Sequence, residues 1–350
     1  MIFVLLLHVN SATIILKGLE AYSDASRFVY YLTEATAYPA IHLFVLIGSY
    51  FMIEHGTRIK SIVNIWLQTI ITTVAGLAIL LVTEPNAVSI GGLLQSLFPF
   101  LLKAYWFVSI YLILMLISPF LRKFANLLAD KWLFLFTAMI CVVCIVFPSF
   151  LSAVDWTAQG DLGLFVCLFF IAACFHRQKP NAKKRKLFLL CSVVSIALMV
   201  LSVYMIGYVG NHISILRGKE QIFYRYSSVF VVTSAVGLFG YFATFQQRGS
   251  IIQQFCGKAA RYSLVVYLVH MHPIIKQFYT EWRIVDYMAT KSALLYSLQL
   301  VGTCLVVGVV CSGIGFFVLR LADYLTTKAV PILKRNQFLC ALYEPTESGK

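Results

Sequence analysis

The stretch LFLLCSVVSIALMVLSVYMIGY at residues 187–208 carries no charged side chain along its whole length. A helix needs about 20 predominantly apolar residues to cross the hydrocarbon core of a bilayer. The segment directly before it, RQKPNAKKRK at residues 177–186, holds six lysines and arginines. An apolar run of this length beside a basic loop is typical of a transmembrane helix whose basic end lies in the cytoplasm.

Similar apolar runs recur along the 350 residues, of which 60% are hydrophobic and only 12% are charged. A soluble domain carries about 25% charged residues, so too little polar surface remains here to cover a soluble fold. The sequence therefore predicts an all-α integral membrane protein with about ten transmembrane helices in one bundle. The short run 90–102 contains two glycines and a proline and predicts an interfacial or re-entrant segment. The expected spans are 1–16, 36–53, 62–83, 104–121, 132–150, 161–176, 187–208, 227–245, 262–279 and 294–320.

The distribution of lysine and arginine predicts the orientation of the bundle. Of the 28 basic residues, 19 follow the even-numbered spans and 9 follow the odd-numbered spans. Because cytoplasmic loops are enriched in these residues, we expect both chain ends in the cytoplasm. The net charge of +14 is then a topology signal and an attraction for anionic membrane lipids, and it does not indicate nucleic-acid binding. We expect one transmembrane domain over residues 1–320 and a short cytoplasmic tail over residues 321–350.

A few polar side chains fall inside the expected spans, where polar groups are costly and tend to be functional. His8 is followed by Asn10 and Ser11, which indicate a polar pocket, and a neutral imidazole there can accept a proton from a hydroxyl group. His270 is a second candidate, although a buried histidine can also be a hydrogen-bonded packing residue. Because His270 and His272 are two residues apart, they lie on different helix faces, and we expect no metal site.

Basic and aromatic residues give further candidates at the ends of the spans. Arg58 and Lys60 directly follow the second span, and a guanidinium fork and an ammonium group can hold a phosphorylated ligand. The enrichment of cytoplasmic loops in basic residues explains the same pair without a ligand. Tyr105 and Trp106 open the fourth span.

Three stretches of the chain together resemble the membrane acyltransferase-3 family. FVLLLHV at residues 3–9 resembles its early helix, which carries a histidine after an apolar run, and LFVLIGSYFM at residues 43–52 resembles its second helix. YWFVSIYLILMLISPFL at residues 105–121 is the most specific match, with an opening Tyr-Trp-Phe and a closing Ser-Pro. Weaker similarity continues through GLFVCLFFIAACF, RYSLVVYLVHMHPI and LRLADYL, so the resemblance covers nearly the whole chain. The family's Ser-Gly order is inverted here as Gly48-Ser49.

The resemblance implies an enzyme that moves an acyl group, usually acetyl from acetyl-CoA, to a hydroxyl of a cell-surface polysaccharide or related glycan. His8 matches the family's essential histidine and would act as general base or carry the acyl group transiently. Arg58 and Lys60 lie near the family's basic pair, which they match imperfectly, and would bind acyl-CoA from the cytoplasm. Acyl-CoA is then a donor substrate, and no cofactor is expected to stay bound.

Aromatic faces suit both sugars and the pantetheine arm, so Tyr105, Trp106 and His270 would line the substrate path. The partners implied are a glycan or lipid-linked sugar and the lipids of the cytoplasmic (inner) membrane of a bacterium. The acyl group, the acceptor and the oligomeric state do not follow from the sequence.

A transporter or flippase for a glycan precursor is the alternative, since it would bind a similar substrate without chemistry. Transporters often contain inverted repeats, and we find no internal repeat, which favours the enzyme. The first expected span is short for a crossing, and the family's arginine upstream of the histidine has no counterpart before His8. We therefore expect this chain to lack part of its first helix, either because the start codon is misassigned and the gene encodes further residues upstream, or because a true truncation leaves the enzyme impaired.

Overall fold

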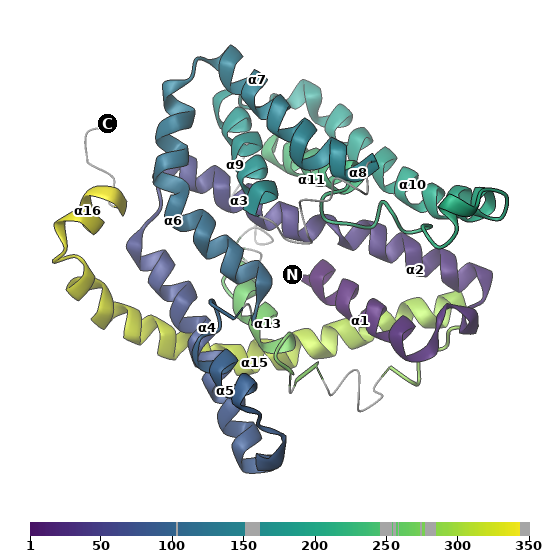
Figure 1. Cartoon of the computed structure of the whole chain (residues 1–350), viewed down its shortest axis with the longest axis horizontal. Coiled ribbons are helices and arrows are strands. Elements are labelled where there is room, and N and C mark those ends of the chain that lie inside the picture. The colour runs from purple at the N-terminus through teal and green to yellow at the C-terminus, as the bar shows by residue number, and fades with distance from the viewer. Residues whose placement is uncertain are drawn as a thin grey trace.

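The computed structural model of the chain describes residues 1–102, 104–150, 162–245, 254, 257, 259–273, 275–276 and 285–343. Within these ranges every regular element is helical (Figure 1). The α-helices are α1 (Ile2–Lys17), α2 (Asp24–Ala37), α3 (Pro39–His55), α4 (Ile59–Thr83), α5 (Ile90–Leu97), α6 (Trp106–Leu127), α7 (Asp130–Cys141), α8 (Phe147–Phe150), α9 (Leu162–Arg177), α10 (Arg185–Gly210), α11 (Val229–Ala243), α13 (Ser263–His270), α15 (Ala293–Leu333) and α16 (Gln337–Tyr343).

Several helices have the length and composition of membrane spans. The apolar helices α1, α9 and α11 are shorter than the long segments. Large apolar side chains cover the outer faces of the long helices, for example Val82, Leu127 and Val309, which are all more than 70% exposed. A surface this apolar requires an apolar surrounding, so the chain is an all-helical, multi-pass membrane protein. The segments long and apolar enough to cross a membrane are Asp24–His55, Ile59–Thr83, Trp106–Leu127, Asp130–Phe150, Ala182–Gly210 and Ala293–Leu333.

The second expected span begins earlier than residue 36. Helix α2 starts at Asp24, where Ser23 caps it by accepting a hydrogen bond from the backbone N–H of Ser26. Pro39 does not break the chain direction, because Tyr38 keeps α-helical angles and proline needs no N–H donor at the first position of α3. Residues 24–35 contain charged side chains, so the hydropathy pattern predicts a loop there. Tertiary packing instead makes this segment helical.

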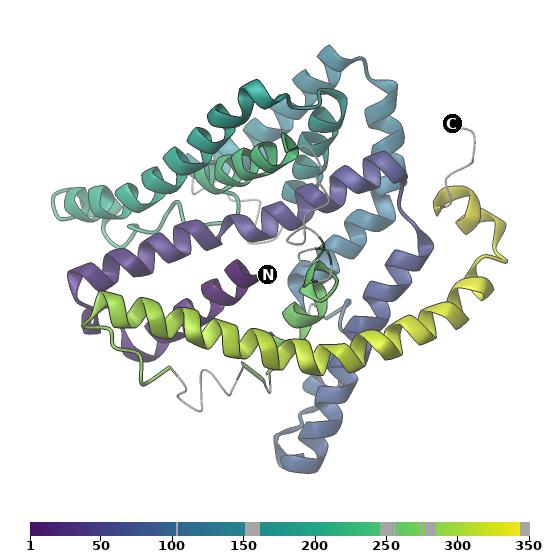
Figure 2. The ribbon, with the colours of Figure 1, turned by 180° about the vertical axis from the view of Figure 1, so that it is seen from behind.

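The last long helix extends beyond the expected boundary at residue 320. Helix α15 runs without interruption from Ala293 to Leu333, which corresponds to about 60 Å along its axis. The hydrocarbon core is about 30 Å thick, so one end of α15 projects well past it. In Figure 2 this helix crosses the whole molecule. Within the expected ninth span, the structure describes the eight-residue helix α13.

Close helix pairs build the bundle around α1. Helices α10 and α11 pack against each other where α11 carries Gly237 and Gly240. A Cβ atom at Gly237 would lie 2.7 Å from the carbonyl oxygen of Phe188, so only glycine allows this approach. Helix α3 packs on α9, and α4 packs on α15. The start of α1 lies in the middle of the molecule in both views (Figures 1 and 2).

At each end of the bundle, hydrogen bonds join helix connections to one another. The connections after even-numbered spans are joined at one end, and those after odd-numbered spans at the other. Arg122 Nε donates to the carbonyl oxygen of Ile53 at 2.8 Å, which joins the end of α6 to the end of α3. Arg177 Nη1 pairs with Asp130 at 2.6 Å, which joins the end of α9 to the start of α7. At the other end, Thr290 donates to the backbone of the α1–α2 connection at 3.0 Å. The connections that follow the second, fourth and sixth spans therefore lie together.

Candidate active site

His8 and His270 form a hydrogen-bonded pair inside the bundle. His8 Nδ1 lies 2.8 Å from His270 Nε2, and the two ring centroids are 5.0 Å apart. His8 stands in the middle of α1, and His270 is the last residue of α13. The pair joins segments separated by 262 positions in the sequence.

The hydrogen bonds of the pair determine which nitrogens carry protons. His270 Nδ1 lies 2.7 Å from the carbonyl oxygen of Val266. A carbonyl oxygen only accepts, so Nδ1 donates, and the Nε2 atom of a neutral His270 is an acceptor. His8 Nδ1 must then donate to it, which leaves His8 Nε2 as an unprotonated acceptor. No residue in the described ranges donates to His8 Nε2, so this nitrogen is available to take a proton.

A buried polar network holds the opposite face of α1. Asn10 Nδ2 donates to Glu34 Oε1 at 2.7 Å, and the hydroxyl of Ser11 donates to the same oxygen at 3.3 Å. Tyr296 of α15 donates to Asn10 Oδ1 at 2.5 Å. Glu34 is only 4% exposed and Asn10 is fully buried. The network links α1 to α2 and α15, and it fixes the helix that carries His8.

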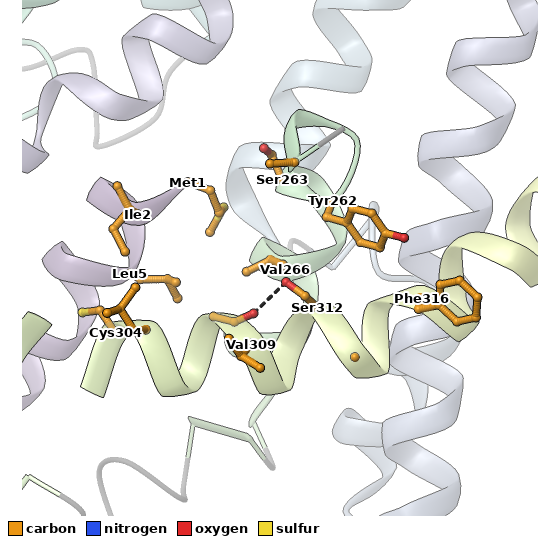
Figure 3. Close-up of a pocket in the computed structure, with 14 residues that line it drawn as sticks. Met1, Ile2, Leu5, Tyr262, Ser263, Val266, Cys304, Val309, Ser312 and Phe316 are labelled. Carbon is orange, nitrogen blue, oxygen red and sulfur yellow. Dashed lines mark hydrogen bonds between the residues drawn. The ribbon is translucent and has the colours of Figure 1, made fainter. Parts of the chain in front are cut away.

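Two apolar cavities lie about one helical turn from the histidine pair, and neither histidine lines them. The larger, of about 620 Å³, lies between α1, α13 and α15 (Figure 3), and the smaller, of about 190 Å³, lies between α1, α3, α6 and α13. Leu5 and Val266 line the larger cavity, whereas Val4 and Tyr267 line the smaller one. Each of these residues precedes the histidine of its helix by three or four positions, which is about one turn. Both cavities therefore end near the pair.

The wall of the larger cavity offers a ligand few free hydrogen-bonding groups. Ser312 donates its hydroxyl to the backbone oxygen of Gly308 at 2.7 Å (Figure 3), so its polar group is already satisfied within α15. The remaining wall consists mostly of aliphatic side chains, including Leu5 and Val309. Such a wall suits an alkyl chain or a thioester.

Of the two aromatic candidates, Tyr105 contacts α13. Tyr105 is 3% exposed, and its hydroxyl donates to the backbone oxygen of Leu268 at 2.9 Å, two residues before His270. Its ring therefore supports the helix that carries His270. Trp106 is partly exposed, and its ring centroid lies 5.2 Å from that of Tyr226. Neither side chain lines the two apolar cavities described above.

The basic candidates lie at the turn between α3 and α4. Arg58 is the N-cap residue of α4, and both Arg58 and Lys60 are exposed. Neither forms an ion pair or side-chain hydrogen bond with a residue in the described ranges. Gly56 makes the turn with a φ of 75°, and a Cβ atom there would lie 3.2 Å from Arg122 Nη1. The turn thus presents two cations whose charges remain available.

Fold and site together define an integral membrane protein with a partly buried histidine pair about one helical turn from two apolar cavities. Residues 1–317 match the family Acyl_transf_3, which is described as an acyltransferase domain. The chain therefore belongs to the acyltransferase-3 family and is an acyltransferase for groups other than aminoacyl groups. This match confirms the family predicted from the sequence motifs. Comparison with curated proteins and with solved structures gives no match.

Proposed function

We propose that the protein is an O-acyltransferase of the bacterial cytoplasmic membrane that moves an acyl group, most simply acetyl, from acyl-CoA to a hydroxyl of a cell-surface polysaccharide or related glycan. The observation that carries the proposal is the His8–His270 pair, because its hydrogen bonds leave His8 Nε2 ready to accept a proton. Family membership supplies the acyl transfer.

In the proposed reaction, His8 Nε2 takes the proton of the acceptor hydroxyl while the hydroxyl oxygen attacks the carbonyl carbon of the thioester. The new C–O bond forms, the C–S bond breaks, and the leaving CoA thiolate receives the proton from His8. During the step the His8 ring is positively charged, and its Nδ1–H bond to His270 becomes charge-assisted and therefore stronger. The base is thus stabilised most when it holds the proton.

The surroundings of the pair support the same assignment of substrates. The apolar cavities suit the acyl thioester and the pantetheine arm of the donor. Trp106, with its partly exposed ring, would border the acceptor path, and Tyr105 supports α13. Arg58 and Lys60 would contact the phosphate groups of acyl-CoA from the cytoplasm.

The direct test is acyl transfer by the purified full chain in lipid nanodiscs. Incubation with radiolabelled acetyl-CoA and a surface-glycan preparation is expected to yield base-labile label on the glycan. A transporter of glycan precursors would instead move the glycan across a vesicle membrane without labelling it. Transport without acyl transfer from any acyl-CoA tested would contradict the proposed function.

We further propose that one domain over residues 1–320 crosses the membrane ten times, with both chain ends and the tail from residue 321 in the cytoplasm. A reporter fused at Lys183 or Arg335 is expected to report the cytoplasm, and a reporter at Gly218 the outside, because basic loops stay inside. Paired alkaline phosphatase and fluorescent-protein fusions measure this. Alkaline phosphatase activity at Lys183 would exclude the proposed orientation.

A further inference from the structure

A third cavity extends the larger apolar cavity toward charged side chains. It has a volume of about 510 Å³ and lies between the start of α13 and the second half of α15. Tyr262 and Phe316, which Figure 3 shows on the wall of the larger cavity, also line the third cavity, so the two spaces adjoin at these rings. The inner part is apolar, whereas Arg261 and Arg320 line the outer part.

The charges of the outer cavity leave one arginine uncompensated. Arg261 forms an ion pair with Asp323, and Asn64 of α4 donates to the other carboxylate oxygen at 3.0 Å. The carboxylate is therefore neutralised. The Arg320 guanidinium lies 5.1 Å above the centroid of the Phe316 ring, and its N–H groups have no hydrogen-bond partner in the described part of the chain. A planar guanidinium with free donors at a cavity wall suits a phosphate group.

The joined cavities have the dimensions and polarity of one amphipathic ligand. Gly308 marks the inner end, since a Cβ atom there would lie 3.2 Å from Leu5, one turn before His8. Arg320 follows Gly308 by twelve positions, about 18 Å along the helix axis. This distance is on the scale of an extended phosphopantetheine arm. Lys60 precedes Asn64 by one turn of α4, so the sequence-derived basic pair belongs to the same end of the space.

We propose that the joined cavities between α13 and α15 bind acyl-CoA, with its thioester at the inner apolar end and a phosphate group on Arg320. This inference rests on the proposed function and assigns its donor site. It adds Arg320 to the basic candidates, and it places the Tyr262 and Phe316 rings beside the path of the ligand. An anionic lipid headgroup carries the same phosphate chemistry, and the experiment below distinguishes the two sources.

The test measures CoA binding by the full chain in phosphatidylcholine nanodiscs, with isothermal titration and no acceptor. Arg320→Gln is expected to raise the Kd for CoA by about tenfold or more, because a charge-assisted contact to phosphate is lost. Lys328→Gln is the matched control, since it removes the same charge from α15 at a residue that does not line the cavity. Pantetheine, which lacks phosphate groups, is expected to bind both variants and the unmodified protein equally.

The outcomes separate this inference from the proposed function. An unchanged Kd for CoA in the Arg320→Gln variant overturns the donor site, even if acyl transfer continues. If that variant lowers activity only in nanodiscs that contain anionic lipid, with CoA binding unchanged, a headgroup is the ligand and the donor site is wrong. If CoA binding depends on Arg320 but no acyl transfer occurs, the site holds and the proposed function fails.

Discussion

His8→Ala is expected to abolish most acyl transfer, lowering the rate by about 10²–10⁴-fold, while the amount of protein in the membrane stays the same. A positioned general base contributes this much when it takes the proton of the attacking hydroxyl. The expectation follows from the protonation pattern, in which His8 Nε2 is the nitrogen left free to accept. Initial rates of label transfer from acetyl-CoA, normalised to immunoblotted protein, measure the effect.

The matched control is His55→Ala. His55 is an exposed histidine at the end of α3, where it lies 3.5 Å from Glu54, and it has no place in the proposed reaction. The control variant should transfer acyl groups at the normal rate. If His8→Ala retains near-normal activity, the proton is accepted elsewhere, and His8 has a structural role only.

Much of the fold follows from the sequence because apolar runs of sufficient length have few alternatives to a membrane helix. The runs at 62–83 and 187–208 lie within α4 and α10. The hydropathy pattern fails to predict a helix where polar side chains form hydrogen bonds with residues that are distant in the sequence. Because glutamate is a charged residue type, the hydropathy pattern predicts a loop at Glu34. Inside the bundle, however, Asn10 and Ser11 donate hydrogen bonds to it.

Like the fold, the candidate site can be predicted from the sequence only in part. Motif similarity and the polar neighbours of His8 identify it from the sequence alone, and His270 emerges as a polar group at membrane depth. Their contact does not follow from the sequence, because 262 positions separate them and only the packing of α1 and α13 brings them together. The sequence does not single out Arg320, the residue of the proposed donor site, because it presents Arg320 as one more basic residue at a helix end expected in the cytoplasm.

The sequence around Glu34 contains a local signal that could have indicated a functional position there. Glu34 stands ten positions after Asp24 in a segment that also contains Tyr30 and Tyr31, and a carboxylate so close to an apolar run is a functional-site signal at membrane depth. The position of Arg320 beside Phe316 carries no such signal, because its cavity is formed by α13 and α15 together.

His270→Ala is expected to lower acyl transfer by about 10–100-fold without a matching change in the KM for acyl-CoA. His270 Nε2 accepts from the His8 ring, and a hydrogen bond to a charged group contributes about 1.5–3 kcal/mol. That bond is charge-assisted only while His8 holds the proton, so its loss falls on the chemical step. His270→Gln keeps an acceptor on a side chain of similar reach and should recover part of the rate, which a packing role for the ring would not explain.

The double variant decides whether the two histidines act as a unit. If His270 works through His8, then His8→Ala with His270→Ala should be no slower than His8→Ala alone, because residues that act together show non-additive losses. Independent roles would instead multiply the two effects, and the double variant would fall by a further 10–100-fold. Rates of the four proteins, each normalised to membrane level, complete the cycle. A multiplicative result would separate His270 from the proton transfer and leave His8 as a base without a histidine partner.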